Sequence, residues 1–233
     1  PGAILDMLYP PGAPVTIPVI AVTGTNGKTT TTRLVAHLFR RTGACVGYTT
    51  TDGIYFQEHL LQEGDFTGPF AAGVVLANPR VDVAVLEAAR GGILRSGLGF
   101  DACDVGIVLN VTADHLGLRG IHTVEDLARV KSVIASVVKP EGHAVLNADD
   151  PLVLGMRSRT PETVVLTSVT GESNPAVAEH LAGGGMAVVV EDEGGREMIV
   201  IRRGAERVPV AAVDEVPLAM GGAARFQLGN LLA

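Results

Sequence analysis

The sequence predicts an α/β protein built on a doubly wound, mostly parallel sheet with helices on both faces. Short apolar segments alternate with helical segments along residues 19–150, the pattern of repeated strand–helix units. Mean hydropathy is +0.33 and only 4% of the residues are aromatic, which suits buried strands of small aliphatic side chains. At 233 residues the chain is long enough to bury such a core.

The elements are expected in the following order. Residues 1–18 are rich in proline and are interpreted as an incoming linker, and residues 19–233 as one domain. The predicted strands are 19–22, 45–49, 83–86, 105–109 and 144–146, and the predicted helices are 28–42 and 124–139. Gly43 is expected to end the first helix.

The pattern changes near residue 186. Three β-like runs, at 186–191, 197–202 and 207–213, predict a small antiparallel meander near the C-terminus, packed beside the main sheet. Residues 222–233 resemble the opening of a helix.

The bulk properties exclude several classes of partner. The net charge is −7 and no cluster of Lys or Arg stands out, which argues against a nucleic-acid or anionic-membrane surface. Cys45 and Cys103 lie in apolar contexts and are interpreted as reduced thiols of a cytoplasmic protein. The first residues lack the features of a signal peptide, and no apolar run is long enough to span a bilayer.

A phosphate-binding loop follows the first predicted strand. Residues 23–30 read Thr-Gly-Thr-Asn-Gly-Lys-Thr-Thr, and they lie between a buried strand and a helix. Backbone N–H groups of such a loop bind phosphate oxygens, while Lys28 reaches the β- and γ-phosphates and Thr29 ligates Mg²⁺. Val22 stands where the general P-loop pattern requires glycine, so only the Gly-Lys-Thr end of that pattern holds. The fold is therefore expected to be P-loop-like.

Two polar clusters follow later strands, where ligands of doubly wound sheets bind. Glu87 ends the strand 83–86 and is a candidate Mg²⁺ ligand, although a strand-end carboxylate alone is more often only solvated. The segment 110–117 begins with Asn110 and holds the pair Asp114-His115, in which a carboxylate could orient a metal-binding imidazole. This segment also fits the Asp-x-x-Gly motif of GTPases, but no guanine-reading Asn-Lys-x-Asp occurs, so GTP is disfavoured.

Lys131 lies sixteen residues after His115 on the second predicted helix. A lysine on a helix is usually solvated, but its neighbours Val130, Val133 and Ile134 suggest a partly buried face. Burial favours the neutral, nucleophilic amine. Such an amine can take up CO₂ to form a carbamate, which is an anionic metal ligand.

Together these motifs resemble the middle domain of the Mur ligase superfamily. The resemblance implies that residues Gly24–Thr30 bind ATP, that Thr29, Glu87, His115 and Lys131 bind Mg²⁺, and that Lys131 is carbamylated. The family's asparagine-rich motif, with one adenine-contacting Asn, corresponds to 225–233, where Asn230 fits. Gln227 and Phe226 replace the family's earlier Asn and the His before it.

One branch of the superfamily is most similar. The segments 47–53, 87–98 and 103–106 resemble the cyanophycin synthetase family, whose Mur-like part joins arginine to aspartate side chains of a polymer. The resemblance implies an ATP-dependent ligase acting through an acyl phosphate, with Lys28, Glu87, His115 and Lys131 as catalytic residues. The further C-terminal domain of Mur ligases is expected to be absent from this chain, so the chain alone would turn over poorly.

The acceptor and the activity remain open at this stage. Thr49, Thr50, Thr51, Asp52, Arg90 and Arg95 are candidates for binding the acceptor, and loop-capping hydroxyls with surface arginines are an equal alternative. A ligase for a cell-wall peptide precursor is the first alternative function. A non-catalytic ATP-binding regulatory module is the second. The oligomeric state is not predicted.

Overall fold

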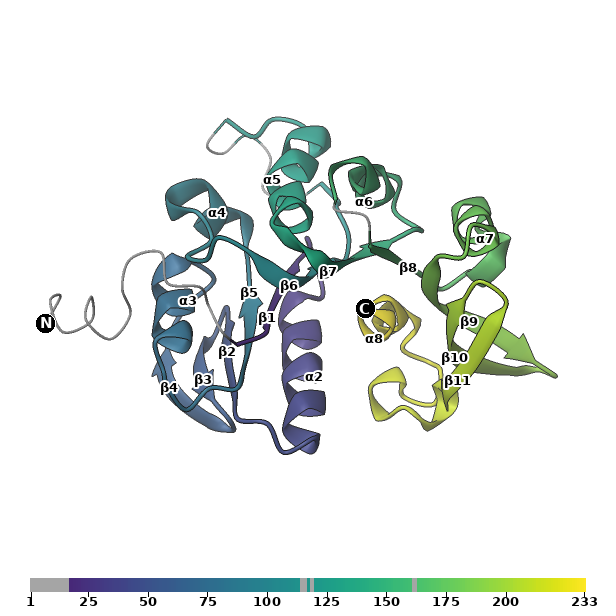
Figure 1. Cartoon of the computed structure of the whole chain (residues 1–233), viewed down its shortest axis with the longest axis horizontal. Helices are drawn as coiled ribbons and strands as arrows, with labels where there is room; N and C mark the ends of the chain where they lie inside the picture. Colours follow the sequence, from purple (N-terminus) through teal and green to yellow (C-terminus); the bar gives the residue numbers. More distant parts are fainter. Residues whose placement is uncertain (1–16, 114–116, 118–119, 161–162) are drawn as a thin grey trace, which may run out of the picture.

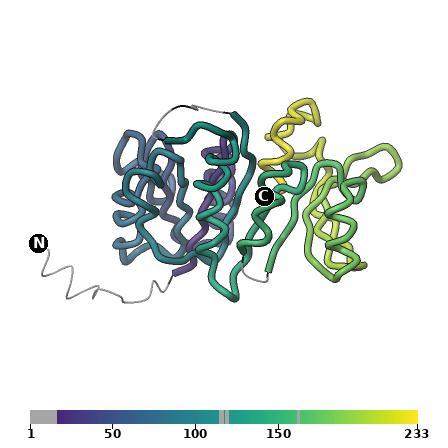
Figure 2. The backbone as a smooth tube through the Cα atoms, turned by 90° about the horizontal axis from the view of Figure 1, so that it is seen from above, coloured from purple at the N-terminus to yellow at the C-terminus, as the bar shows by residue number. Residues whose placement is uncertain are grey.

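The computed structural model describes residues 17–113, 117, 120–160 and 163–233, so most of the predicted linker lies outside the described residues. The strands form one eleven-stranded sheet in the order β11-β10-β9-β8-β7-β6-β1-β5-β2-β3-β4. Along the long axis of the molecule, β2, β3 and β4 lie toward one end and β9, β10 and β11 toward the other, with β1 between them (Figures 1 and 2). The predicted α/β class with a mostly parallel sheet is confirmed.

The parallel part of the sheet carries the site. Its strands are β1 (Val19–Thr23), β2 (Val46–Thr50), β5 (Val83–Glu87), β6 (Cys103–Val108), β7 (Val138–Asn147), β8 (Val164–Ser168) and β9 (Met186–Glu193). β1 lies between β5 and β6 and pairs in parallel with both. The carboxyl ends of these strands therefore meet at one edge, where the loops that follow them are brought together.

Antiparallel strands extend both ends of the sheet. They are β3 (Gly53–Phe56) and β4 (His59–Glu63) beyond β2, and β10 (Arg196–Arg203) and β11 (Glu206–Ala212) beyond β9. The predicted C-terminal meander is thus confirmed, but its expected position beside the sheet is wrong. β9 pairs in parallel with β8, so the meander continues the same sheet. A run of local strand patterns does not reveal which edge it will join.

Helices cover both faces. They are α2 (Lys28–Arg41), α3 (Pro69–Leu76), α4 (Arg90–Ser96), α5 (Val124–Ser136), α6 (Pro151–Leu154), α7 (Pro175–Ala182) and α8 (Leu228–Leu232). In Figure 1, α2 and α8 lie on one side of the sheet and α5, α6 and α7 on the other. Three apolar clusters are buried among the described residues, and the two that include β1 follow this division, because alternate β1 residues point to opposite faces. Ala21 packs in the core that contains α3 and α5, and Val22 in the core that contains α2.

Two helix ends test the sequence reading directly. α2 ends at Arg41 and Gly43 adopts φ 92°, a left-handed conformation that favours glycine, as expected for its terminator. The second predicted helix was extended too far, because α5 ends at Ser136 and β7 begins at Val138. Lys139 instead pairs with Asp104 at 2.8 Å, at the amino end of the sheet.

The two thiols are free, with Cys45 partly exposed and Cys103 buried, where burial raises the pKa of Cys103 to about 12. Within the described ranges, none of the helices has the length and apolar character needed to cross a membrane.

Candidate nucleotide and metal site

The loop between β1 and α2 presents main-chain amides at a helix N-terminus. Gly27 is the N-cap of α2 with φ 84°, and no side chain caps the helix. No acidic residue lies in the first turn of α2. The first amides of α2 are therefore available to an anion, and the helix dipole favours one there.

The two loop glycines are required by close packing. A Cβ at Gly24 would lie 2.9 Å from the Leu109 Cβ, and a Cβ at Gly27 would lie 1.9 Å from the Asn230 Oδ1. The loop thus lies between the end of β6 and α8. Gly24 is thus favoured by its close approach to Leu109, and Gly27 by its approach to Asn230 and by its left-handed conformation.

Asn110 fixes the loop from the end of β6. Its Oδ1 accepts the Asn26 N–H at 2.8 Å, and its Nδ2 donates to the Asn26 carbonyl at 3.1 Å. The Thr25 N–H donates to the Asn110 carbonyl at 2.9 Å. Thr112, which the sequence analysis did not single out, donates its N–H to the Thr25 hydroxyl at 3.0 Å. Asn110 therefore supports the predicted nucleotide loop.

Thr29 and Glu87 meet at the mouth of the loop. The Thr29 hydroxyl donates to the Glu87 Oε2 at 2.8 Å, and the Thr51 hydroxyl lies 3.2 Å from the Thr29 hydroxyl. Glu87 is only 3% exposed, and its Oε1 is buried with no hydrogen-bond partner among the described residues. Mg²⁺ prefers hard oxygen ligands. The Thr29 hydroxyl and the neighbouring Glu87 carboxylate, one oxygen of which is buried without a hydrogen-bond donor, are ligands of that type.

The electrostatics of Glu87 leave its ionised form incompletely stabilised. Burial raises the pKa of Glu87, and the Thr29 hydrogen bond and the charge of Lys28 only partly oppose this effect. A divalent cation would remove the imbalance, because it stabilises the ionised carboxylate. In the parts of the chain that the structure describes, no group of three or more His, Cys, Asp and Glu side chains forms a metal cluster. The predicted ligand His115 lies outside the described residues.

The two predicted lysines both contact the loop. The Lys28 Nζ donates to the Thr25 carbonyl at 3.0 Å, which curls its side chain over the loop. Lys131 on α5 is 3% exposed, and its Nζ donates to the Gly24 carbonyl at 2.7 Å. The partly buried face predicted for Lys131 is thus confirmed, and its amine lies within hydrogen-bond reach of the phosphate loop.

A cavity of about 220 Å³ adjoins the loop between the ends of β6, β7 and β8 and the segment that leads into α8. Asn110, Asn147, Thr167, Phe226 and Asn230 are among its lining residues. Phe226 is 79% exposed, so its ring face is open to a ligand. The Asn230 Nδ2 donates to the Gln227 Oε1 at 2.7 Å, which orients its amide beside Gly27. α8 contacts both α2 and β8, so the cavity is closed by chain that is distant in sequence.

The predicted acceptor residues divide into two groups. Thr49 and Thr50 are buried, and Thr51 and Asp52 are exposed in the turn between β2 and β3 beside Thr29. Arg90 and Arg95 lie on α4, directly after β5 and Glu87. The Arg95 Nε donates to the Gly91 carbonyl at 2.9 Å, and the rest of this exposed side chain borders a hollow that Asp65 and Phe70 also line.

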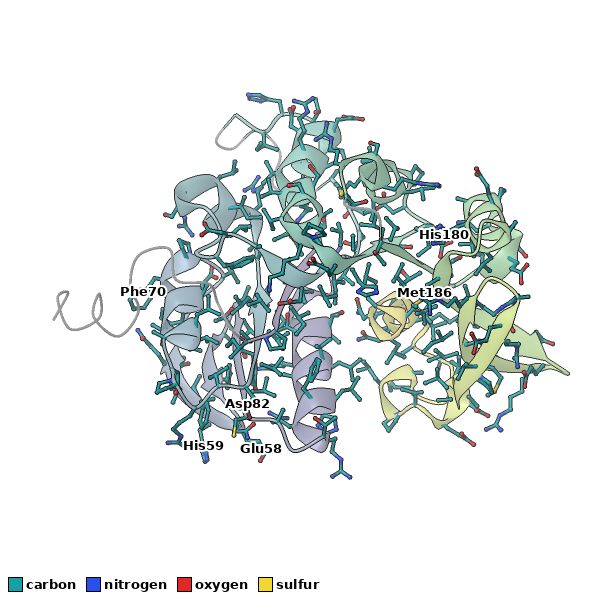
Figure 3. All side chains as sticks on the ribbon, viewed as in Figure 1. Glu58, His59, Phe70, Asp82, His180 and Met186 are labelled. Atoms are coloured by element: carbon teal, nitrogen blue, oxygen red, sulfur yellow. The ribbon has the colours of Figure 1, made fainter. Side chains whose placement is uncertain are left out.

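Some functional contacts were not found from the sequence. Asp149, after β7, accepts hydrogen bonds from the Ser168 hydroxyl at 2.6 Å and the Val169 N–H at 2.7 Å, and so shapes one wall of the cavity. The run of polar residues after a strand was a signal for it. His180 lies apart from this site, on α7, and its Nε2 is 3.1 Å from the Met186 carbonyl (Figure 3).

Fold and site define an α/β domain of the P-loop-like class, in which Glu87 at the end of β5 contacts the start of α2 through Thr29. The profile of the Mur ligase middle domain matches residues 22–204. The chain belongs to the Mur ligase middle-domain family.

Relatives and solved structures agree with this assignment. A cyanophycin synthetase of Crocosphaera subtropica is 54% identical over 99% of this chain and 26% of its own length. The chain thus spans about a quarter of the length of that relative. A UDP-N-acetylmuramoyl-L-alanyl-D-glutamate–2,6-diaminopimelate ligase structure matches with a TM-score of 0.63 and 22% identity, over 93% of this chain and 45% of that one. A folylpolyglutamate synthase/dihydrofolate synthase structure with Mn, AMPPNP and L-glutamate matches with a TM-score of 0.59 and 18% identity, over 93% and 54%. At such identities the structures show the shared fold.

Proposed function

We propose that this chain is the ATP-binding domain of a longer, cytoplasmic ligase that joins a carboxylate to an amino acid. The observation that carries the proposal is the buried, unpartnered Oε1 of Glu87 beside the Thr29 hydroxyl, at the mouth of an uncapped helix N-terminus. Phosphate groups need the amides and the lysine, and Mg²⁺ needs the two oxygen ligands. All of these groups are supplied by one edge of the sheet.

Each residue has a role in holding ATP and magnesium. Thr29 and Glu87 would hold Mg²⁺ at the phosphates, and Lys28 would leave the Thr25 carbonyl to reach the β- and γ-phosphates. Asn230 and the exposed ring of Phe226 border the cavity that we assign to the adenine. His115 and a carbamylated Lys131 would hold a second Mg²⁺. For Lys131 this requires the neutral amine to attack CO₂, forming an N–C bond and releasing one proton to solvent.

The reaction requires that a carboxylate be made electrophilic. The acceptor carboxylate attacks the γ-phosphorus, the bond to the ADP oxygen breaks, and an acyl phosphate forms. The amine then attacks the acyl carbon, and phosphate leaves as the amide forms. The chain's own contribution is to position the phosphates and to offset their developing charge, through Lys28 and the α2 amides. Arg90 and Arg95, which follow Glu87 on α4, are the proposed binding groups for the anionic acceptor.

We propose arginine as the amino acid and aspartate side chains of cyanophycin as the acceptor. The support is the 54% identity to a cyanophycin synthetase over 99% of the chain, against 34% over 78% of the chain to a UDP-N-acetylmuramoylalanine–D-glutamate ligase of Pelotomaculum thermopropionicum. A ligase for a cell-wall precursor is the alternative within the same mechanism. A regulatory ATP-binding module is the alternative from another class, and the buried Glu87 and Lys131 oppose it because a passive module needs neither.

The experiment compares this chain with the complete protein that carries it. ADP release is followed with a β-Asp-Arg oligomer and arginine, with a cell-wall precursor and its amino acid, and with neither. ADP release and amide formation that require the oligomer and arginine would support the proposal. Release only with the cell-wall precursor would move the protein to the other branch, and ATP binding without any ligation would favour the regulatory module.

A further inference from the structure

The turn between β2 and β3 touches both candidate magnesium ligands. The Thr51 hydroxyl lies 3.2 Å from the Thr29 hydroxyl. The Thr51 backbone also lowers the pKa of Glu87, which favours the ionised carboxylate. Thr51 itself is exposed, and it lies between two strand ends. The contact between Thr51 and Thr29 therefore depends on other interactions that keep the β2–β3 turn packed against α2.

Arg33 connects α2 to this turn. It lies four residues after Thr29 on α2, so it occupies the same helix face about 6 Å further along the axis. Asp52 follows Thr51 in the turn, and its Oδ2 accepts from the Arg33 Nη2 in an ion pair. Two neighbouring turn residues thus meet two residues spaced by one turn of α2.

The ion pair is part of a network and not an isolated surface contact. Tyr55 on β3 donates its hydroxyl to the Asp52 Oδ2 at 3.3 Å, and the Arg33 Nη2 lies 3.2 Å from the same hydroxyl. The Thr50 hydroxyl donates to the Asp52 Oδ1. The Asp52 carboxylate therefore accepts hydrogen bonds from α2, from the end of β2 and from β3.

Two tyrosine rings pack against this hydrogen-bond network. The Arg33 guanidinium lies 5.7 Å from the centre of the Tyr55 ring, and that ring stacks on Tyr48 at 4.7 Å with an angle of 3° between the planes. Tyr48 and Tyr55 are also paired across β2 and β3. Side-chain exposures of 48% for Arg33 and 49% for Asp52 leave the pair partly open to solvent, so rigidity comes from the combined contacts.

We propose that Arg33 and Asp52 are positioning residues that clamp the β2–β3 turn onto α2 and so preorganise Thr29 and Glu87 for Mg²⁺. The inference rests on the proposed function for its purpose. It gives Asp52 a role in holding the turn, distinct from the acceptor binding expected from sequence. Neither residue touches ATP or the reacting atoms in this role, because both act through Thr51.

The test measures ATP affinity by calorimetry with Mg²⁺ and with EDTA, in the wild type and in variants. Arg33→Ala should reduce the Mg²⁺-dependent gain in ATP affinity by about fivefold and leave the affinity in EDTA unchanged. Arg33→Lys keeps the charge but loses the planar contacts, so it should retain part of the gain. Arg41→Ala, an exposed arginine at the end of the same helix, is the matched control and should behave as wild type.

Hydrogen–deuterium exchange gives a second readout that requires no ligand. In Arg33→Ala and Asp52→Asn, amides at residues 50–53 should exchange at least about fivefold faster, while those of β5 stay protected. If the Mg²⁺-dependent gain survives Arg33→Ala, or the turn exchanges as in the wild type, the clamp is refuted. If the wild type shows no Mg²⁺-dependent gain, the proposed nucleotide site fails as well, so the two failures are distinguishable.

Discussion

Replacing Glu87 by glutamine should raise the free energy of unfolding of the metal-free protein and weaken ATP binding in the presence of Mg²⁺. The side chain is 3% exposed and Oε1 is buried without a partner, so the carboxylate bears a desolvation penalty in the unliganded protein. The pKa of Glu87 is raised, which means that burial outweighs the Thr29 hydrogen bond and the nearby Lys28 charge. Glutamine keeps the shape and removes the charge.

The magnitude follows from the buried charge of Glu87. Glutamine leaves a polar atom at the unpartnered position, so only the desolvation penalty of the charge, on the order of several kcal/mol for a buried ion, is relieved; the weaker Thr29 hydrogen bond to a neutral amide and the lost attraction to Lys28 offset most of it. We therefore expect Glu87→Gln to raise the free energy of unfolding by about 1 kcal/mol at neutral pH in the absence of metal. The same change should weaken ATP binding in Mg²⁺ by at least about tenfold, because a charged ligand is lost.

The pH dependence has a defined sign. Because the folded-state pKa of Glu87 lies above its ordinary 4.5, the folded protein holds this proton to higher pH than the unfolded chain does. The relative stability of the wild type is therefore highest below about pH 4.5 and is lost as pH rises through the folded-state pKa. The difference between wild type and Glu87→Gln should be near zero in acid and reach its plateau above that pKa.

Urea unfolding across this pH range measures the effect, with Glu58→Gln, an exposed glutamate, as the control. Saturating MgATP should reverse the order and make the wild type the more stable protein, since ligand binding to the folded state adds stability. A Glu87→Gln variant that is less stable than the wild type without metal would show that Glu87 is not a penalised buried charge, and one whose ATP affinity in Mg²⁺ is unchanged would show that Glu87 is not a magnesium ligand.

Four further predictions follow from the same site. Lys28→Ala should lower ATP affinity at least about tenfold by calorimetry, and the wild type should prefer ATP to GTP; equal GTP affinity would count against the adenine cavity. Gly27→Ala should cost about 1–2 kcal/mol in unfolding experiments, because its φ is 84° and the new Cβ would collide with Asn230. In the complete protein, Lys131→Ala should lose activity and recover part of it with short carboxylic acids, and full activity without them would exclude the carbamate. This chain alone should form the amide far more slowly than the complete protein, because its site is left open to water.

Local patterns made the sheet and the phosphate loop predictable. The strand 19–22, the Gly-Lys-Thr end of the loop and Gly43 after α2 each depend on neighbours in sequence, and each was placed within a residue or two. The burial of Lys131 followed from its apolar helix neighbours. The position of Glu87 beside the loop could be predicted because strand ends meet at one edge of a doubly wound sheet, and Glu87 does contact Thr29 there, while its role as a metal ligand stays a prediction.

Contacts between distant segments could not be predicted in the same way. The hairpin of β3 and β4 follows the turn at Thr51-Asp52, and nothing in its spacing shows that Asp52 pairs with Arg33 on α2. The close approach of Asn230 to Gly27 spans most of the chain, and only a family resemblance suggested that α8 returns to the loop. The meander was misplaced for the same reason, since strand pairing with β8 is a tertiary choice.

Transfer of ¹⁸O from the acceptor to phosphate is the direct test for an acyl phosphate intermediate. The complete protein would be given an acceptor whose reacting carboxylate carries ¹⁸O, with arginine and MgATP, and the products would be examined by mass spectrometry. An acyl phosphate requires that one labelled oxygen leave with the phosphate, so the account predicts ADP and inorganic phosphate that carries one ¹⁸O. Label in AMP, or amide formation with unlabelled phosphate, would contradict the proposed ligase chemistry.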